Sequence, residues 1–227
     1  MNKLSAICDL LGITLSKWAE RRGAVAYCQE ADYCKISLEE ALHVKDCVQQ
    51  RIKEFSTGRY LARKALRKLG WKEEVVVGVG RFYEPLWPPG IQGSITHDDG
   101  VVAVCVRKGG LSGLGMIGID VINVDKAASF GRDVRNVCLN QDDHEFFMNY
   151  CVNGIDYAFL VLSIKESIVK AISATVGDFV EIDNIKLRYS PNKSIVEYYG
   201  RRWVAEISYQ SYSGFILSMV DLSEEGS

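Results

Sequence analysis

The 227-residue sequence is short of several features that would assign a protein class directly. It has no run of the 18 or more consecutive apolar residues that a membrane-spanning helix needs. Its seven cysteines include no Cys-x-x-Cys pair and are odd in number, which argues against a zinc cage or a disulfide framework and favours reduced thiols. The net charge is only −2, so the chain as a whole does not attract nucleic acid. We therefore expect a soluble, cytoplasmic protein that binds neither nucleic acid nor membrane.

What is present is enough chain for one large domain or two small ones, since a domain usually has about 100 to 200 residues. Ser37 and Glu40 form a predicted capping box at the start of a helix over 37–69, with a candidate break at 56–58. Asn140 is expected to cap a short helix. The region 83–100 is expected to be a Pro- and Gly-rich loop, and the strands are expected at 75–79, 101–107, 116–122, 179–189, 203–209 and 214–221.

A second long helix is expected to begin after Asp156 and to end near Thr175. Its apolar residues are distributed around most of its circumference, which indicates a largely buried helix, yet it carries Lys165, Glu166 and Lys170. A surface pair of Glu166 with Lys170, worth about 0.3–0.5 kcal/mol, is one interpretation. The other is that each charge has a buried partner, a metal or a ligand.

Asp120 is the only charge inside the apolar strand "MIGIDVI". An ionised carboxylate in such a setting needs a hydrogen bond, an ion pair or a metal. It either ties down the turn at the end of the strand or joins Glu166 as an oxygen ligand of Mg²⁺, which typically keeps waters and binds substrate phosphates.

The stretch "GSITH", Gly93 to His97, follows a Trp-Pro-Pro-Gly turn. Its free N–H groups, the Thr96 hydroxyl and the His97 imidazole are the groups that wrap a phosphate in a backbone nest. The alternative is a Gly-rich turn with a surface histidine. "GSITH" matches neither the Walker pattern nor G-x-G-x-x-G.

Basic residues are concentrated between residues 51 and 68, where Glu54 is the only acid. Arg59, Arg63 and Arg67 are spaced by four and form one stripe on the predicted helix, with Arg51 on nearly the same side. This pattern is typical of a solvated helix face, but its excess of positive charge in an acidic protein favours an anion site.

Four motifs, "RIKEFSTGRYLAR", "EPLWPPGIQGSITH", "GIDV" and "LSIKESIVK", occur in this order between about residues 51 and 172. In this order they resemble the 4'-phosphopantetheinyl transferases of the large monomeric surfactin and enterobactin type. The segment "WPPGIQGSITH" is most similar to the enterobactin-synthesis branch, which serves siderophore biosynthesis.

The resemblance implies an α+β fold with a pseudo-twofold duplication of two α/β halves and the active site in the cleft between them. The halves would be residues 1–114, on the nucleotide side, and 115–227, on the metal side. Such an enzyme is a cytoplasmic monomer of holo-[acyl-carrier-protein] synthase type. It moves the phosphopantetheine arm of coenzyme A to a serine of an acyl or peptidyl carrier protein and releases adenosine 3',5'-bisphosphate. The carrier would belong to a polyketide, nonribosomal peptide or fatty-acid synthase.

On the matching positions, the resemblance implies that Asp120 and Glu166 hold Mg²⁺, with Mn²⁺ as the alternative. Glu166 would also take the serine proton, directly or through a water. Lys165 and Lys170 would contact phosphates, and Lys170 would stabilise charge on the transferred phosphoryl group. The residues implied around the nucleotide phosphates are Arg51, Arg59, Arg63, Ser94, Thr96 and His97.

Two positions depart from the family pattern. Ile122 stands where many members have a second metal-binding acid, and a water is expected to take its place. Relatives often have a lysine near the pyrophosphate just before "EP", and here Arg81 is the candidate substitute. The Ile122 departure motivates an alternative, a degenerate homologue that binds coenzyme A or a carrier protein without transfer. A different Mg²⁺-dependent phosphoryl transferase or phosphoesterase is a further alternative.

Overall fold

A computed structural model of the protein describes residues 2–72, 75–109, 116–129, 139–143, 157–190 and 193–225. The chain divides into two compact units, Met1–Leu111 and Ser112–Ser227. The boundary predicted between 114 and 115 lies in the stretch 110–115, outside the described residues. Helices and strands are mixed in each unit, which confirms the predicted α+β class. None of the helices in the described part of the chain is long and apolar enough to cross a membrane.

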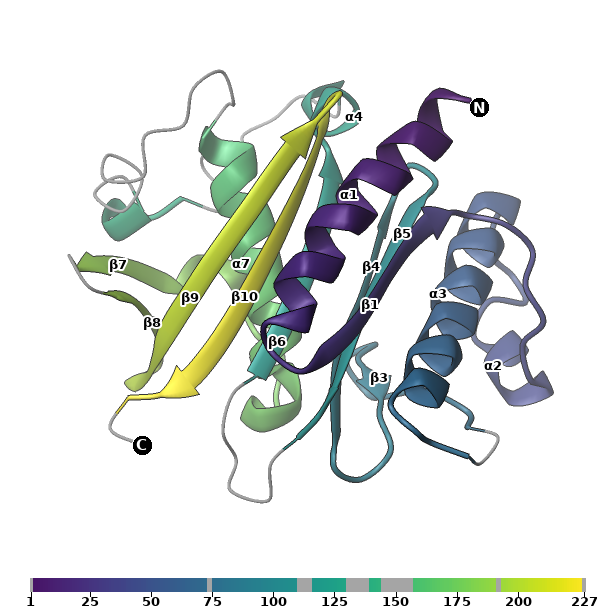
Figure 1. Ribbon diagram of the computed structural model, residues 1–227. Coiled ribbons are helices and arrows are strands. Elements are labelled where there is room, and N and C mark those ends of the chain that lie inside the picture. The colour runs from purple at the N-terminus through teal and green to yellow at the C-terminus, as the bar shows by residue number, and fades with distance from the viewer. Residues whose placement is uncertain are drawn as a thin grey trace. The chain divides into compact units, whose positions relative to one another are not determined.

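Unit 1 is built around a three-stranded antiparallel sheet with the strand order β1-β5-β4 (Figure 1). A short pair, β2 and β3, forms a separate two-stranded ribbon. The helices and strands of unit 1 are α1 (Lys3–Glu20), β1 (Ala24–Glu30), α2 (Leu38–Leu42), α3 (Gln49–Lys68), β2 (Gly78–Val79), β3 (Pro85–Leu86), β4 (Ile91–Asp98) and β5 (Val101–Lys108).

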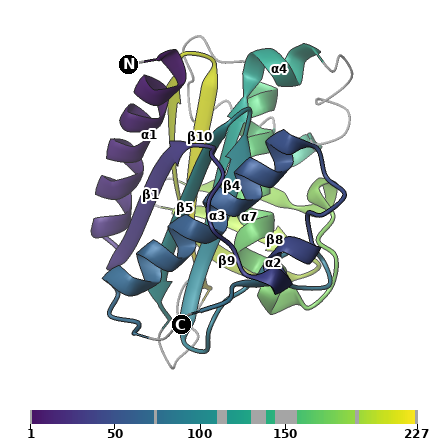
Figure 2. The same cartoon turned by 90° about the vertical axis from the view of Figure 1, so that its right-hand side faces the viewer.

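Two long helices cover opposite faces of this sheet (Figures 1 and 2). Leu61 and Leu66 of α3 pack with Val102 and Val104, two alternate residues of β5 that share one face of the sheet. On the other face, α1 comes close enough to β1 that a Cβ added at Gly12 would lie 3.4 Å from Cβ of Cys28. Unit 1 is therefore a helix–sheet–helix sandwich.

The first predicted helix is corrected in one respect. The capping box of Ser37 and Glu40 is confirmed, but the chain leaves the helix after Leu42 and starts α3 at Gln49, so the break is not at 56–58. Thr57 lies inside α3, where its hydroxyl accepts from the backbone N–H of Asp32 (2.9 Å) and donates to the Asp32 carbonyl (2.8 Å). Thr57, and Ser56 beside it, bind α3 to the segment that follows β1, and they do not interrupt the helix.

Unit 2 holds a five-stranded antiparallel sheet with the order β6-β10-β9-β8-β7. The strands predicted at 116–122, 203–209 and 214–221 are confirmed. The strand predicted at 179–189 begins only at Lys186, after a 3₁₀ turn, and a further strand at Lys193–Tyr198 was not predicted. The elements are β6 (Met116–Asn123), α4 (Val124–Ser129), α7 (Tyr157–Val176), a 3₁₀ turn (Ile182–Asn184), β7 (Lys186–Ser190), β8 (Lys193–Tyr198), β9 (Arg201–Tyr212) and β10 (Phe215–Glu224).

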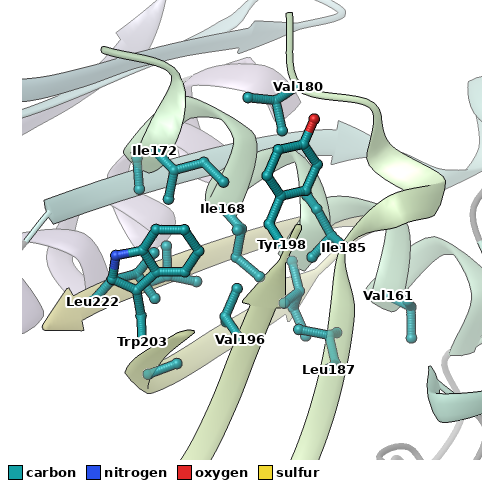
Figure 3. Packing of buried hydrophobic residues seen from close by; sticks show 14 of the residues in the cluster. Val161, Ile168, Ile172, Val180, Ile185, Leu187, Val196, Tyr198, Trp203 and Leu222 are labelled. Atoms are coloured by element: carbon teal, nitrogen blue, oxygen red, sulfur yellow. The ribbon is translucent and has the colours of Figure 1, made fainter. Parts of the chain in front are cut away.

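The core of unit 2 lies between α7 and the sheet. Ile168 and Ile172, one turn apart on α7, point at the indole of Trp203 and at Leu222 (Figure 3). The helix ends at Val176, and Gly177 follows with φ at 70°, the left-handed conformation that commonly closes a helix. The end of this helix is therefore confirmed, whereas the predicted cap at Asp156 lies outside the described residues.

The two units share one order of elements. In each, the first strand pairs with the last, and the last pairs with the one before it: β1-β5-β4 in unit 1 and β6-β10-β9 in unit 2. In each, a long helix, α3 or α7, lies in the chain between the first strand and the last two. This repeat of topology supports the predicted duplication of an α/β half.

Candidate active site

Unit 1 contains a cavity of about 230 Å³ whose lining includes Arg51, Arg59 and His97. The two arginines come from α3, eight residues apart, and so lie about two turns apart on the same side of the helix. His97 comes from β4, two residues after Ile95, which packs on the same core as α3. Three of the residues predicted to bind nucleotide phosphates are thus brought to one cavity by the packing of α3 on the sheet.

Arg59 is the most buried of these cations, with 5% of its surface exposed. Its guanidinium lies 4.5 Å from the ring centroid of Phe55, and its Nη2 donates to the Gly78 carbonyl at 3.3 Å. Within the described part of the chain its Nε has no hydrogen-bond partner. Burial lowers the pKa of Arg59 to about 10, opposed by Glu40, with the nearby Arg51 adding to the decrease. A buried cation with an unpaired N–H at a cavity wall is suited to an anion.

The predicted role of Arg63 as a phosphate ligand is corrected, because Arg63 forms a structural ion pair. Its Nη1 donates to both carboxylate oxygens of Glu40, at 2.8 and 2.9 Å, and its Nη2 donates to the Lys35 carbonyl at 2.6 Å. Glu40 is fully buried and also accepts from the backbone N–H of Ser37 at 2.9 Å. Arg63 therefore anchors α2 to α3 and does not line the cavity, so the predicted stripe is not a continuous anion site.

Ser94 and Thr96 also differ from expectation. They lie in β4, not in a loop, because Ile91–Asp98 pairs residue by residue with β5. Their peptide groups belong to a strand ladder and do not form a nest. Alternation along the strand places both side chains, which are buried, on the face opposite His97. Direct contact of either side chain with a phosphate at His97 is not supported by this geometry.

Glu54 is a cavity residue that the sequence did not identify. Its Oε2 lies 3.1 Å from Nδ1 of His97. Burial alone would raise its pKa, but hydrogen bonds from His97, Gln50 and the Gly100 backbone hold the pKa of Glu54 at about 2. The spacing of three residues from Arg51 was the available indication, since it places an acid on the same helix face as the cation.

Asp120 is the centre of the second cluster, which lies in unit 2. Its Oδ2 accepts from the Ser163 hydroxyl at 2.9 Å, and its Oδ1 accepts from the Lys170 ammonium at 2.5 Å. Ser218, the residue opposite Asp120 on β10, is 2.8 Å from the Ser163 hydroxyl. The sequence prediction that Asp120 needs partners is confirmed. Ser163 and Ser218 were missed, because a serine in an apolar run carries little indication of its partner.

Glu166 lies on α7 between these partners and remains partly exposed. Burial raises the pKa of its carboxyl, Lys170 opposes that increase, and the nearby Asp120 adds to it. The two acids therefore interact with each other. A carboxylate whose charge is incompletely compensated is suited to a cation or to accepting a proton.

The predicted role of Lys165 as a phosphate contact is corrected for the same reason as that of Arg63. Its ammonium donates to Oδ2 of Asp143 at 2.7 Å, and both side chains are fully buried. Asp143 belongs to a reciprocal cap. Its Oδ2 accepts from the Asn140 backbone N–H at 2.6 Å, and Asn140 Oδ1 accepts from the Asp143 backbone N–H at 3.2 Å. The predicted cap at Asn140 is confirmed. Lys165 holds this cap against α7, and its geometry does not support contact with a phosphate.

The donor atoms of the second cluster fit a magnesium ion. Asp120 and Glu166 supply the hard oxygen ligands that Mg²⁺ prefers. No group of three or more His, Cys, Asp or Glu side chains converges within the described ranges. Mg²⁺ usually keeps several waters, so water or substrate could complete the coordination beside Asp120 and Glu166. Ile122, two residues after Asp120 on the same face of β6, packs against the hydrophobic core of unit 2 and offers no ligand.

Several known proteins are similar to this chain in sequence. Residues 38–107 match the model of the 4'-phosphopantetheinyl transferase N-terminal domain. The chain is 27% identical over 185 residues to the 4'-phosphopantetheinyl transferase Svp of Streptomyces mobaraensis, covering 81% of this chain and 73% of that protein. It is 43% identical over 68 residues to the 4'-phosphopantetheinyl transferase Npt of Nocardia iowensis, covering 30% of each.

Among solved structures, a holo-(acyl-carrier-protein) synthase from Bacillus anthracis in complex with CoA is similar over 48% of this chain and 96% of that chain, at 16% identity and a TM-score of 0.35. The placement in the enterobactin-synthesis branch stays a prediction. On the family model, the two relatives and the order of its motifs, the chain is similar to 4'-phosphopantetheinyl transferases, and residues 38–107 match the N-terminal domain of that family.

Proposed function

We propose that this protein transfers the 4'-phosphopantetheine arm of coenzyme A to a serine hydroxyl of an apo acyl or peptidyl carrier protein. The observation that carries the proposal is the convergence of Asp120, Glu166 and Lys170 in a chain that is similar to 4'-phosphopantetheinyl transferases. Phosphoryl transfer needs mainly positioning and charge neutralisation, and this cluster has the groups for both.

In the proposed reaction, Arg51, Arg59 and His97 bind the nucleotide phosphates of coenzyme A. The serine oxygen forms a bond to the phosphorus that carries the pantetheine arm, and the bond from this phosphorus to the bridging oxygen of the pyrophosphate breaks. Adenosine 3',5'-bisphosphate leaves with the bridging oxygen. The transfer is a substitution at phosphorus, and no oxidant or reductant is required.

Glu166 takes the proton of the serine hydroxyl, directly or through a water. A base is most effective when its pKa is close to the working pH, and burial moves the pKa of Glu166 in that direction. Lys170, now paired with Asp120, stabilises the negative charge on the phosphoryl oxygens. Mg²⁺, held by Asp120 and Glu166, would neutralise charge on the pyrophosphate when bound.

The biological setting is part of the same proposal. We expect a cytoplasmic monomer whose carrier belongs to a polyketide, nonribosomal peptide or fatty-acid synthase, and siderophore biosynthesis is the pathway that the "WPPGIQGSITH" wording favours. Whether Arg81 serves the pyrophosphate in place of the usual lysine stays a prediction. Its side chain is exposed and lies 5.3 Å from the ring centroid of Phe82.

A second candidate function rests on Ile122, whose contact with the unit 2 core removes the additional acid of many relatives. It is a protein that binds coenzyme A or a carrier without transfer. The Asp120–Lys170 pair opposes it, because a chain that no longer catalyses transfer has no need to keep a charged pair beside Glu166.

One experiment separates the two. The purified protein is incubated with coenzyme A, Mg²⁺ and a panel of apo carrier proteins, and each carrier is weighed by mass spectrometry. We expect the mass of one phosphopantetheine group on at least one carrier, and no gain when the carrier serine is replaced by alanine. Binding of coenzyme A without any mass gain across the panel would support the second candidate.

A further inference from the structure

The acid among the cations of the unit 1 cavity has no assigned role. The chain places Glu54 one turn from Arg51 on α3 and against His97 on β4. We propose that Glu54 is a positioning residue that acts through His97: it fixes the Nδ1–H tautomer of the imidazole and thereby directs Nε2 to Arg51 and to the anion. This inference rests on the proposed function only where it concerns the nucleotide.

The carboxylate of Glu54 is held in place on both of its oxygens. Oε1 accepts from the side-chain amide of Gln50 at 2.8 Å and from the backbone N–H of Gly100 at 3.2 Å. Oε2 faces Nδ1 of His97 at 3.1 Å. Only 9% of the Glu54 side chain is exposed, so solvent offers few competing partners. The position of His97 is therefore set by an acceptor that has itself little freedom to move.

The direction of the hydrogen bonds determines the tautomer. An ionised carboxylate only accepts, so Nδ1 of His97 must donate to Glu54. In a neutral imidazole Nε2 is then the acceptor, and the structure places Nε2 against Nη1 of Arg51, which only donates. The hydrogen bonds from Arg51 to His97 and from His97 to Glu54 can therefore run only in that direction. Such a partner on the far nitrogen is the usual device for orienting a histidine.

An entering phosphate changes the requirement at Nε2. A phosphate oxygen needs a donor there, so His97 binds it best as the imidazolium, whose charge Glu54 stabilises through Nδ1–H. We therefore expect proton uptake at His97 on binding. The other ionisable or charged groups of this cavity are Arg51 and Arg59 from α3, His43 and Cys47 from the segment that ends α2 and follows it, and Tyr83 from the loop between β2 and β3.

The tautomer is measurable in the unmodified protein. In ¹⁵N-labelled protein at pH 8, without nucleotide, the histidine ring shifts distinguish the two neutral tautomers, and the His97 signals are assigned by their loss in His97→Ala. We expect the Nδ1–H form. Finding the Nε2–H form would overturn the proposal, and this test depends neither on a Glu54 variant nor on the enzyme being active.

Glu54→Gln tests the cause. The Gly100 N–H still requires an acceptor at the Oε1 position, so the new NH₂ group must face Nδ1 of His97. A donor there forces His97 into the Nε2–H tautomer, which then directs a donor at the donor of Arg51. We expect the ring shifts to move to the Nε2–H pattern. The Kd for adenosine 3',5'-bisphosphate should rise roughly 10-fold, because a charge-assisted hydrogen bond from the imidazolium is replaced by one from a neutral imidazole.

A double-mutant cycle shows whether Glu54 acts through His97. In the His97→Ala background, Glu54→Gln should change the Kd for adenosine 3',5'-bisphosphate less than about two-fold, because the residue it positions is gone. The same change in both backgrounds would overturn the proposal. Glu20→Gln, an exposed acid at the end of α1, is the matched control and should leave the Kd unchanged.

Calorimetry in buffers of different ionisation enthalpy gives the proton balance. We expect the wild type to take up protons on binding adenosine 3',5'-bisphosphate and His97→Ala to take up fewer. A wild type that binds neither this nucleotide nor coenzyme A would contradict the proposed function, and the tautomer measurement would still decide the role of Glu54. Equal uptake by the wild type and His97→Ala would contradict the protonation step.

Discussion

The two units share an order of elements but hold their charges in different ways. In unit 1, Arg51 and Arg59 line a cavity, and the acid that lines it with them, Glu54, bonds to His97 and not to either arginine. In unit 2, the two lysines of α7 are each bound to a carboxylate, Lys170 to Asp120 and Lys165 to Asp143. Unit 1 keeps positive charge available for an anion, whereas unit 2 pairs both lysines of α7 with its own carboxylates.

The acids of the two units differ in how far their negative charge is compensated. Hydrogen bonds hold the pKa of Glu54 at about 2, despite burial that would raise it. Burial raises the pKa of Glu166, and Lys170 offsets this only in part. The first acid is satisfied and suits a positioning role, while the second is under-compensated and suits a base or a metal ligand.

The strongest test of this division is Asp120→Asn. The carboxamide keeps the size of the side chain but loses the charge that holds Lys170 and would bind the metal. We expect the transfer rate to fall about 10²–10³-fold or more, with the thermal midpoint nearly unchanged. The Kd for adenosine 3',5'-bisphosphate should stay within about two-fold of the wild type, since its proposed phosphate ligands lie in unit 1. A near wild-type rate would show that the metal assignment is wrong.

Lys165→Met asks whether the second lysine is structural. Removing one partner of a buried pair leaves Asp143 unpaired, so we expect the free energy of unfolding to fall by about 3–5 kcal/mol in a urea titration. Adding Asp143→Leu should recover part of this loss. Lys186→Met, at an exposed position of β7, is the surface control. Unchanged stability together with weaker coenzyme A binding would restore the phosphate role predicted from the sequence.

Arg51→Ala addresses unit 1. Loss of a charged hydrogen-bond donor at the cavity should raise the Kd for adenosine 3',5'-bisphosphate roughly 10- to 100-fold, measured by calorimetry. Arg67→Ala, at an exposed position farther along the same helix, should leave the Kd unchanged. Equal effects at the two positions would mean that the whole arginine stripe binds the anion, against the structure.

The smallest expected effect is one of pH on stability. Because the pKa of Glu166 is raised on folding, the folded state binds this proton more tightly, and the free energy of unfolding falls as pH rises from the ordinary pKa through the raised one. Glu166→Gln should therefore be more stable than the wild type at neutral pH while transfer is lost, and this gain should shrink below the ordinary pKa.

The pKa of Glu54 is shifted in the opposite direction, so the pH dependence of its contribution to stability has the opposite sign and serves as an internal control. Its lowered pKa contributes stability that is present above the ordinary value of 4.5 and is lost as pH falls towards about 2. Glu54→Gln should thus reduce the loss of stability on the acid side. Parallel pH profiles for the Glu54 and Glu166 variants, followed by circular dichroism, would contradict the contrast between the two acids.

Much of the candidate site could be predicted from local sequence. Asp120 and Lys170 stood out because a charge in an apolar strand or helix needs a partner, and they proved to be partners of each other. The caps at Ser37 and Asn140 depend on residues three positions apart, so they too could be identified. Other predictions failed where a distant segment decided the outcome. "GSITH" contains the small residues of a turn, but pairing with β5 makes it a strand.

The sequence by itself determined which residues carry charge and how they are spaced along each helix, because these depend on residue type and on the helical period alone. Only the tertiary structure decided which charges remain available. Arg63 and Lys165 look equivalent to Arg59 and Lys170 by spacing, yet Glu40 and Asp143, more than 20 positions away, bind them. Desolvation and Coulomb attraction depend on position in space, so the partner of each cation appears only when the chain is folded.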